Sequence, residues 1–158
     1  MNDTQYPLAR SKALMGVEAR IQKILFGAAR QIVALSSKYR RGSRLVAESR
    51  FVSEASAITA RLNDNIEGEI ARYATASATA LGISADGVAS FLASSVHGLT
   101  SRQRNTKYLA NFAEDIVRMA KAGILLGYTE QKILSAVRTG YKNPYVSSVI
   151  TKARKKDI

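Results

Sequence analysis

Apolar residues recur at steps of three and four positions through the first quarter of the chain. The repeated positions are Leu14, Val17, Ile21, Ile24, Leu25, Ala28, Ile32 and Leu35. Because such steps return to the same side of an α-helix, the pattern predicts a long amphipathic helix over residues 8–39. Pro7 suits its start, where a missing amide donor costs nothing. The basic cluster that follows interrupts the pattern, and Gly42 within it can turn the chain.

A second long helix is predicted over residues 45–81. Its apolar positions again follow steps of three and four, and they are Phe51, Ala55, Ile58, Leu62, Ile66, Ile70, Tyr73, Ala76 and Ala80. This spacing is close to that of a coiled-coil seam. Asn63, Asn65 and Gly68 mark a soft spot where the helix could bend or break, and Gly82 is expected to stop it in a left-handed conformation.

Shorter helical segments follow, separated by capping residues and glycines. Ser84 is expected to cap a helix that reaches residue 96 and buries Val88, Phe91, Leu92 and Val96. Thr100 and Gln103 have the spacing of a capping box, which predicts a helix from there to about residue 126. Gly127 is expected to end that helix.

Two further helices are predicted towards the C-terminus. The first covers residues 130–138, begins after Thr129 and stops at Gly140. The second covers residues 145–156 after the break at Asn143-Pro144, with Val146, Val149, Ile150 and Ala153 on one side.

No segment alternates apolar and polar residues long enough to predict a strand. The expected fold class is therefore all-α: a bundle or an elongated hairpin of five to six helices, with no sheet. The length of 158 residues fits one domain over residues 1–158. An alternative division has a long-helix hairpin over residues 1–97 and a smaller basic helical subdomain over residues 98–158.

Charge is unevenly distributed along the chain. Residues 1–50 have a net charge of +7, residues 51–100 of −3 and residues 101–158 of +8, which together give the total of +12. Two basic ends around a mildly acidic middle favour an anionic partner, most commonly nucleic acid. Solubility combined with self-assembly through complementary charge is the alternative.

The usual catalytic residue types are scarce. The chain has no Cys and a single histidine, His97. This excludes cysteine-ligated zinc and leaves almost nothing for a Ser–His or Cys–His nucleophile. Glu67 and Glu69 are two positions apart on a predicted helix and point different ways, as do the adjacent Glu114 and Asp115. We therefore expect no enzyme, no metal site and no cofactor. Without an apolar run of membrane-spanning length, we also expect no membrane partner and synthesis in the cytoplasm.

Two basic clusters are the candidate nucleic-acid-binding residues: Arg40, Arg41, Arg44, Lys152, Arg154, Lys155 and Lys156. The C-terminal cluster permits two nucleic-acid hypotheses. Residues 145–156 could be the recognition helix of a helix-turn-helix, although six residues make a long turn for that motif. Alternatively, a basic amphipathic helix could lie on phosphates without reading bases. The third interpretation is a solvated basic end with no partner.

Residues 98–144 resemble the helical region of phage minor head proteins of the Mu F-like, head-morphogenesis type. The resemblance lies in Gly98-Leu99-Thr100, Arg104, Tyr108, the block 112–116, Gly127, Thr129-Glu130, Ile133, Arg138 and Asn143-Pro144. Residues 58–72 are similar to the helical hairpin that precedes this region in the family.

The resemblance implies a structural minor head protein, in the virion after assembly in the host cytoplasm. It implies as partners further copies of the chain or other virion proteins, of the portal or capsid, together with packaged DNA bound without sequence preference. The alternative from the residues is a small helical nucleic-acid-binding regulator that uses its C-terminal helices.

Overall fold

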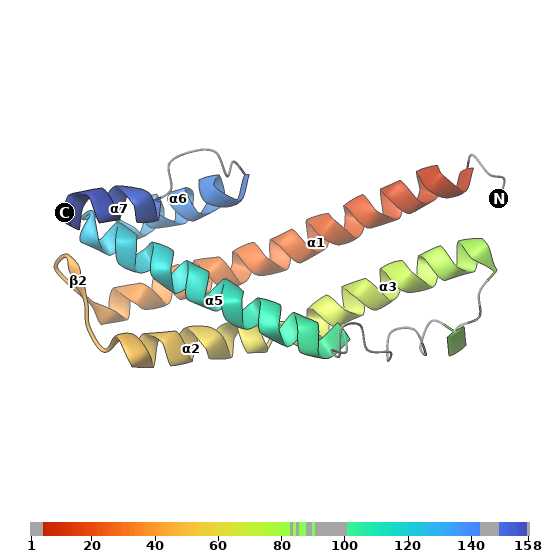
Figure 1. Cartoon of the computed structure of the whole chain (residues 1–158), viewed down its shortest axis with the longest axis horizontal. Coiled ribbons are helices and arrows are strands. Elements are labelled where there is room, and N and C mark those ends of the chain that lie inside the picture. Colours follow the sequence, from red (N-terminus) through yellow and green to blue (C-terminus); the bar gives the residue numbers. More distant parts are fainter. Residues whose placement is uncertain are drawn as a thin grey trace. The chain divides into compact units, whose positions relative to one another are not determined.

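The computed structural model describes residues 5–82, 84, 86–87, 90, 101–142 and 149–157, and these residues are mostly helical (Figure 1). The helices are α1 (Gln5–Ser36), α2 (Glu48–Ala60), α3 (Asn63–Leu81), α5 (Ser101–Leu125), α6 (Glu130–Lys142) and α7 (Val149–Asp157). Between α1 and α2 lie a short 3-10 helix, η1 (Ser37–Tyr39), and the strands β1 (Arg40–Arg41) and β2 (Arg44–Leu45). The predicted all-α class is thus confirmed in broad terms.

The expectation of no sheet was wrong for residues 40–45. β1 and β2 form a two-stranded antiparallel ribbon in which Arg40 lies opposite Leu45 and Arg41 opposite Arg44. Gly42 has a φ of +62°, the left-handed backbone that a tight hairpin turn requires. The sequence marks this turn, but strands of two residues are too short for an alternating pattern to reveal them.

The predicted helix over residues 45–81 is divided into α2 and α3, which are separated by Arg61 and Leu62. The break lies just before Asn63, the first position of the predicted soft spot. Asn63 is buried, and its amide nitrogen donates to the Thr106 hydroxyl at 2.7 Å. Asparagine favours helix starts over helix interiors, because its side chain competes for backbone hydrogen bonds. The predicted stop at Gly82 is confirmed: its φ is +74°, and its amide donates to the carbonyl of Thr79.

The turn between α5 and α6 follows the predicted signals. Gly127 has a φ of +76°, and the amide of Tyr128 donates to the carbonyl of Gly123 at 2.9 Å. Thr129 caps α6, since its hydroxyl accepts from the amide of Lys132 at 3.2 Å. The predicted stop at Gly140 was wrong, because α6 continues to Lys142. A glycine inside a helix costs only about 1 kcal/mol, which packing can offset.

Some predicted features fall outside the described residues. This applies to most of the helix expected over residues 84–96, including its apolar face, and to residues 143–148 with the Asn143-Pro144 break. The expected cap at Ser84 is present, because its hydroxyl accepts from the amide of Gly87 at 3.2 Å. Of the residues predicted to share one side of the last helix, Val149 and Ala153 are buried in α7 and Ile150 is partly buried.

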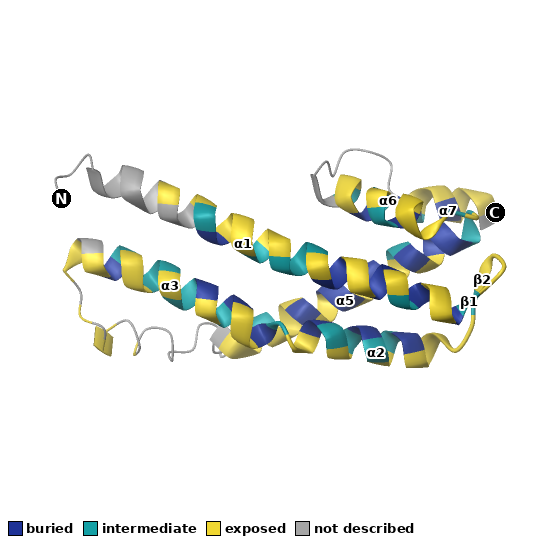
Figure 2. Cartoon of the chain, turned by 180° about the vertical axis from the view of Figure 1, so that it is seen from behind, coloured by how far each residue is buried: buried dark blue, intermediate teal, exposed yellow. Residues whose placement is uncertain are grey.

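The chain divides into two compact units, each assembled from two stretches of sequence. Unit 1 comprises Met1–Leu25 and Leu62–Tyr108, and unit 2 comprises Phe26–Arg61 and Leu109–Ile158. Most of the buried apolar residues belong to unit 2, where they line α5 and the parts of α1 and α2 within this unit (Figure 2). The largest are Phe51, Ile32, Leu109, Ile116, Ile124 and Ile133. The described part of unit 1 buries only Val17, Ile66 and Ala78 among its apolar residues.

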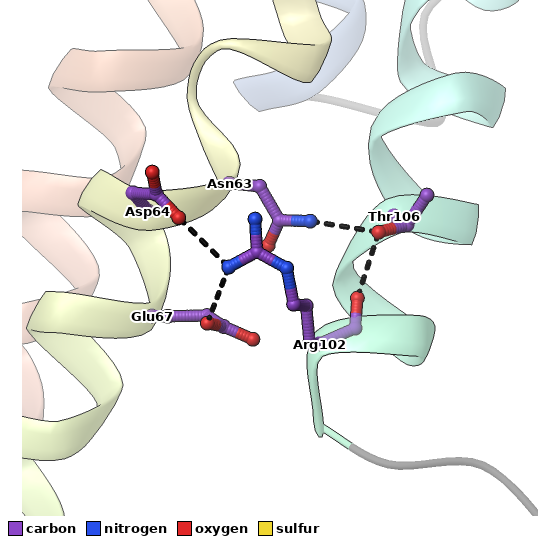
Figure 3. Close-up of polar contacts among 5 residues, drawn as sticks. All are labelled: Asn63, Asp64, Glu67, Arg102 and Thr106. Carbon is purple, nitrogen blue, oxygen red and sulfur yellow. Dashed lines mark hydrogen bonds and ion pairs between the residues drawn. The ribbon is translucent and has the colours of Figure 1, made fainter.

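Within unit 1, polar contacts also connect α3 with the start of α5 (Figure 3). The guanidinium of Arg102 contacts Asp64 at 2.7 Å and Glu67 at 3.2 Å, and both carboxylates raise the pKa of Arg102. The Thr106 hydroxyl, which accepts from Asn63, donates to the carbonyl of Arg102 at 2.8 Å. Asp64 and Glu67, two acidic residues from the middle of the sequence, thus form ion pairs with Arg102.

A third acidic residue of unit 1 is engaged in the same way. Glu69 is buried, with an exposed fraction of 8%, and its carboxylate contacts Arg20 at 2.6 Å and Arg72 at 3.2 Å. Its charge is therefore neutralised inside the unit. Asp64, Glu67 and Glu69 thus all pair with basic residues of their own unit.

Replacement of Gly123 by alanine should destabilise the protein by about 1–3 kcal/mol. A Cβ at this position of α5 would lie 2.5 Å from Cγ1 of Ile133 on α6, too close unless that side chain or the helices shift. Chemical unfolding measures the loss. Gly27→Ala is the matched control: a Cβ on this helical glycine meets nothing within 4 Å, so the change should stabilise by about 0.5–1 kcal/mol. Equal effects of both changes would contradict a close approach at Gly123.

Candidate nucleic-acid interface

Unit 2 carries most of the positive charge of the chain. It contains 16 Lys and Arg residues against 6 Asp and Glu, a net charge of +10, whereas unit 1 contains 8 against 6, a net charge of +2. All seven candidate residues from the two basic clusters belong to unit 2. Two segments that are about 110 positions apart in the sequence therefore contribute to the same compact unit.

Arg40 and Arg41 occupy adjacent positions in β1 but have different surroundings. Arg40 is half-buried: its Nη1 donates to the carbonyl of Tyr128 in the α5–α6 turn, and its Nε to that of Gly42 at 2.9 Å. Arg41 is exposed, and among the described residues it donates only to neighbouring carbonyls of its own segment, such as that of Arg40 at 2.8 Å. Arg40 therefore braces the hairpin against the turn, while the charge of Arg41 faces solvent.

The basic residues of α7 also differ in their surroundings. Lys156 donates from its Nζ to the carbonyl of Leu125 at 2.9 Å, the last residue of α5. A lysine there satisfies a helix-end carbonyl and suits the negative end of the helix dipole. Lys152, Arg154 and Lys155 are exposed. Lys156 thus has a structural role as well as a charge.

An open cleft of about 560 Å³ brings together residues from both basic clusters. Arg44 from β2 and Arg154 from α7 both line it. Arg118 and Lys121 of α5, which are not among the predicted binding residues, line it as well. They carry the same charge as the chosen clusters and lie three positions apart on one helix, which is the signal that could have identified them.

The cations of the cleft differ in how far they are neutralised. Lys121 pairs with Glu48 at 3.0 Å, and Arg118 lies 4.0 Å from Asp115 on the exposed surface of its own helix. Exposed pairs of this kind contribute little to stability and are easily exchanged. The guanidinium groups of Arg44 and Arg154 form no ion pair with any described residue. These two are the cations of the cleft that are ready to bind an external anion.

In the described residues, no three His, Asp or Glu side chains gather in a way that could hold a metal ion. No described helix is long and apolar enough to cross a membrane. His97 lies outside the described residues.

Exposed lysine and arginine side chains on a helical unit can bind phosphates as point charges, which fixes position without reading sequence. Such contacts release counterions and therefore weaken as salt increases. No protein-family model, curated protein sequence or solved structure matches the chain.

Proposed function

We propose that this chain is a structural component of a phage head, associated with the portal or capsid, that contacts packaged DNA without sequence preference and catalyses no reaction. The observation that carries the DNA contact is the net charge of +10 on unit 2, with exposed cations from both the hairpin and α7. The resemblance of residues 98–144 to phage minor head proteins supports the head assignment. We further propose that its five to six helices form a bundle or elongated hairpin.

Arg41, Lys152 and Lys155 are the best placed of the candidate residues to meet phosphates. All three are exposed, and none forms an ion pair with a described residue. Arg40 and Lys156 instead donate to backbone carbonyls of unit 2, so these two side chains stabilise the fold of the unit. Lysine and flexible arginine side chains on an open surface follow the phosphate backbone rather than base edges, so no preferred sequence is expected.

The proposal predicts weak, salt-sensitive binding to any duplex. Fluorescence anisotropy with two labelled duplexes of unrelated sequence should give equal dissociation constants, which rise steeply between low and physiological salt. Light scattering of the protein alone should show species larger than a dimer, as expected of a subunit that assembles. A monomer or dimer that does not bind DNA at low salt would contradict both parts of the proposal.

The second candidate is a small DNA- or RNA-binding regulator that uses its C-terminal helices. The observation in its favour is α7 itself, a short helix whose outer face carries Lys152 and Lys155. A regulator should remain a monomer or dimer and prefer one site over random duplex by about 10³-fold or more. Selection of bound sequences from a random duplex pool tests this: enrichment of a single motif would favour the regulator and exclude the structural role.

A further inference from the structure

The cleft of unit 2 has an apolar floor that phosphate binding does not require. The apolar lining residues, here called the floor, include Ala122 and Leu125 of α5 and Ile150 and Ala153 of α7. Leu125 and Ile150 are only partly buried, and both pack at the edge of a small cluster that centres on Ala122, Val149 and Ala153. Apolar surface that stays in contact with water is a source of binding energy for a partner with aliphatic side chains.

The lining of the cleft also carries positively charged side chains. Arg44 and Arg154 line the cleft and form no ion pair with any described residue. Arg118 of α5 contributes a third guanidinium group to the lining. Arginine binds carboxylates through two parallel hydrogen bonds, which gives both strength and orientation. Apolar lining residues together with these arginines therefore suit a ligand that combines aliphatic groups with carboxylates.

We propose that this cleft binds a short acidic peptide segment of a partner protein, with a leucine or isoleucine side chain on the floor and Asp or Glu carboxylates against Arg44 and Arg154. Charge complementarity and the aliphatic floor identify this occupant. A volume of about 560 Å³ holds an anchoring side chain and its neighbours, rather than a whole domain. The inference goes beyond the DNA contact proposed above and does not depend on it.

Two features of the lining favour a peptide over nucleic acid. None of the described residues that line the cleft is aromatic, whereas single-stranded nucleic acids gain much of their affinity by stacking bases on aromatic rings. Glu48 also lines it and holds Lys121 at 3.0 Å, so a phosphate chain entering here would meet a carboxylate. A peptide can place its own cation, or an amide, beside Glu48.

Helix geometry separates the cleft from the surface proposed for DNA. With about 100° of rotation per residue, Ile150 and Arg154 share one side of α7. Lys152 projects from about the opposite side of the helix, and Lys155 from well away from the cleft. One short helix can thus contact a peptide and a phosphate backbone at the same time.

The test uses a fluorescein-labelled dodecapeptide that carries Asp and Glu around two leucines, titrated with the full chain and followed by anisotropy. The double variant Arg44→Glu/Arg154→Glu should weaken binding by about tenfold or more. Lys23→Glu/Lys107→Glu is the matched control, since it makes the same charge change at exposed positions of unit 1 and should leave peptide binding as it was.

A second probe removes any dependence on the folding of a variant. The same peptide with serine in place of both leucines should bind the unaltered protein about tenfold more weakly, because it cannot fill the floor. Equal binding of the leucine and serine peptides, or equal loss in both double variants, would show simple charge attraction and overturn the proposal. Displacement of the labelled peptide by single-stranded DNA at lower concentrations than unlabelled peptide requires would overturn it in favour of a nucleic-acid cleft.

Discussion

The triple variant Arg41→Glu/Lys152→Glu/Lys155→Glu should bind random duplex DNA about 100-fold more weakly than the unaltered chain at low salt. Each phosphate contact contributes close to one unit to the slope of log affinity against log salt, so losing three should make that slope shallower by about 2–3. The substituted side chains are exposed, and none forms an ion pair with a described residue. The change should therefore leave the fold intact, and anisotropy across a series of salt concentrations measures both quantities.

The control for this variant must change the net charge by the same amount. Lys12→Glu/Lys23→Glu/Lys107→Glu does so at exposed positions of unit 1, the unit with a net charge of only +2. If the position of the charge matters, this control should reduce the affinity much less than the triple variant of unit 2. Equal losses would show that DNA responds to the total charge of the chain, and the interface on unit 2 would be wrong.

Local features of the fold could be predicted because their causes lie within a few residues. Gly82 and Gly127 adopt positive φ where a helix must end, and Thr129 caps α6 through an amide three positions away. The burial of Val149 and Ala153 likewise follows from their spacing of four. Such signals depend on backbone sterics and helix geometry, which are the same whatever the rest of the chain does.

Which basic residues belong to the candidate site could not be predicted in the same way, because this depends on contacts between residues far apart in the sequence. Arg40 and Lys156 belong to the same basic clusters as Arg41 and Lys155, yet they bond carbonyls 88 and 31 positions away. The sequence shows where the charges are but not which of them the fold uses for itself. The cleft presents the same difficulty, since Arg118 joins Arg44 and Arg154 only after α5 packs beside α7.

The close approach of α5 and α6 at Gly123 shows a further limit. Both helices bury apolar residues at this point, Ile124 on α5 and Ile133 on α6. The apolar pattern does not tell which residue of one face meets which residue of the other. That choice depends on ridges and grooves formed by many side chains together.

Replacement of Phe51 by alanine should destabilise the protein by about 3–5 kcal/mol, a large part of the stability of an ordinary domain. Phe51 is fully buried in unit 2, with an exposed fraction of 0%. Its ring stacks on that of Tyr39, with the centroids 5.6 Å apart and the planes inclined by 11°. Tyr39 directly precedes β1, so this stack joins α2 to the hairpin that carries Arg41 and Arg44. The loss should therefore reduce the affinity for DNA as well as the midpoint of denaturation.

Two further variants separate packing from a general sensitivity to substitution. Phe51→Leu keeps most of the apolar volume and should cost less than half as much as alanine, because a smaller cavity remains. Met15→Ala removes a side chain that is 68% exposed in α1, and should change the free energy of unfolding by no more than about 0.5 kcal/mol. Urea unfolding followed by circular dichroism measures all three. A cost below about 1 kcal/mol for Phe51→Ala would mean that the stack does not hold the hairpin to α2, and the DNA surface would then lack the support that this structure gives it.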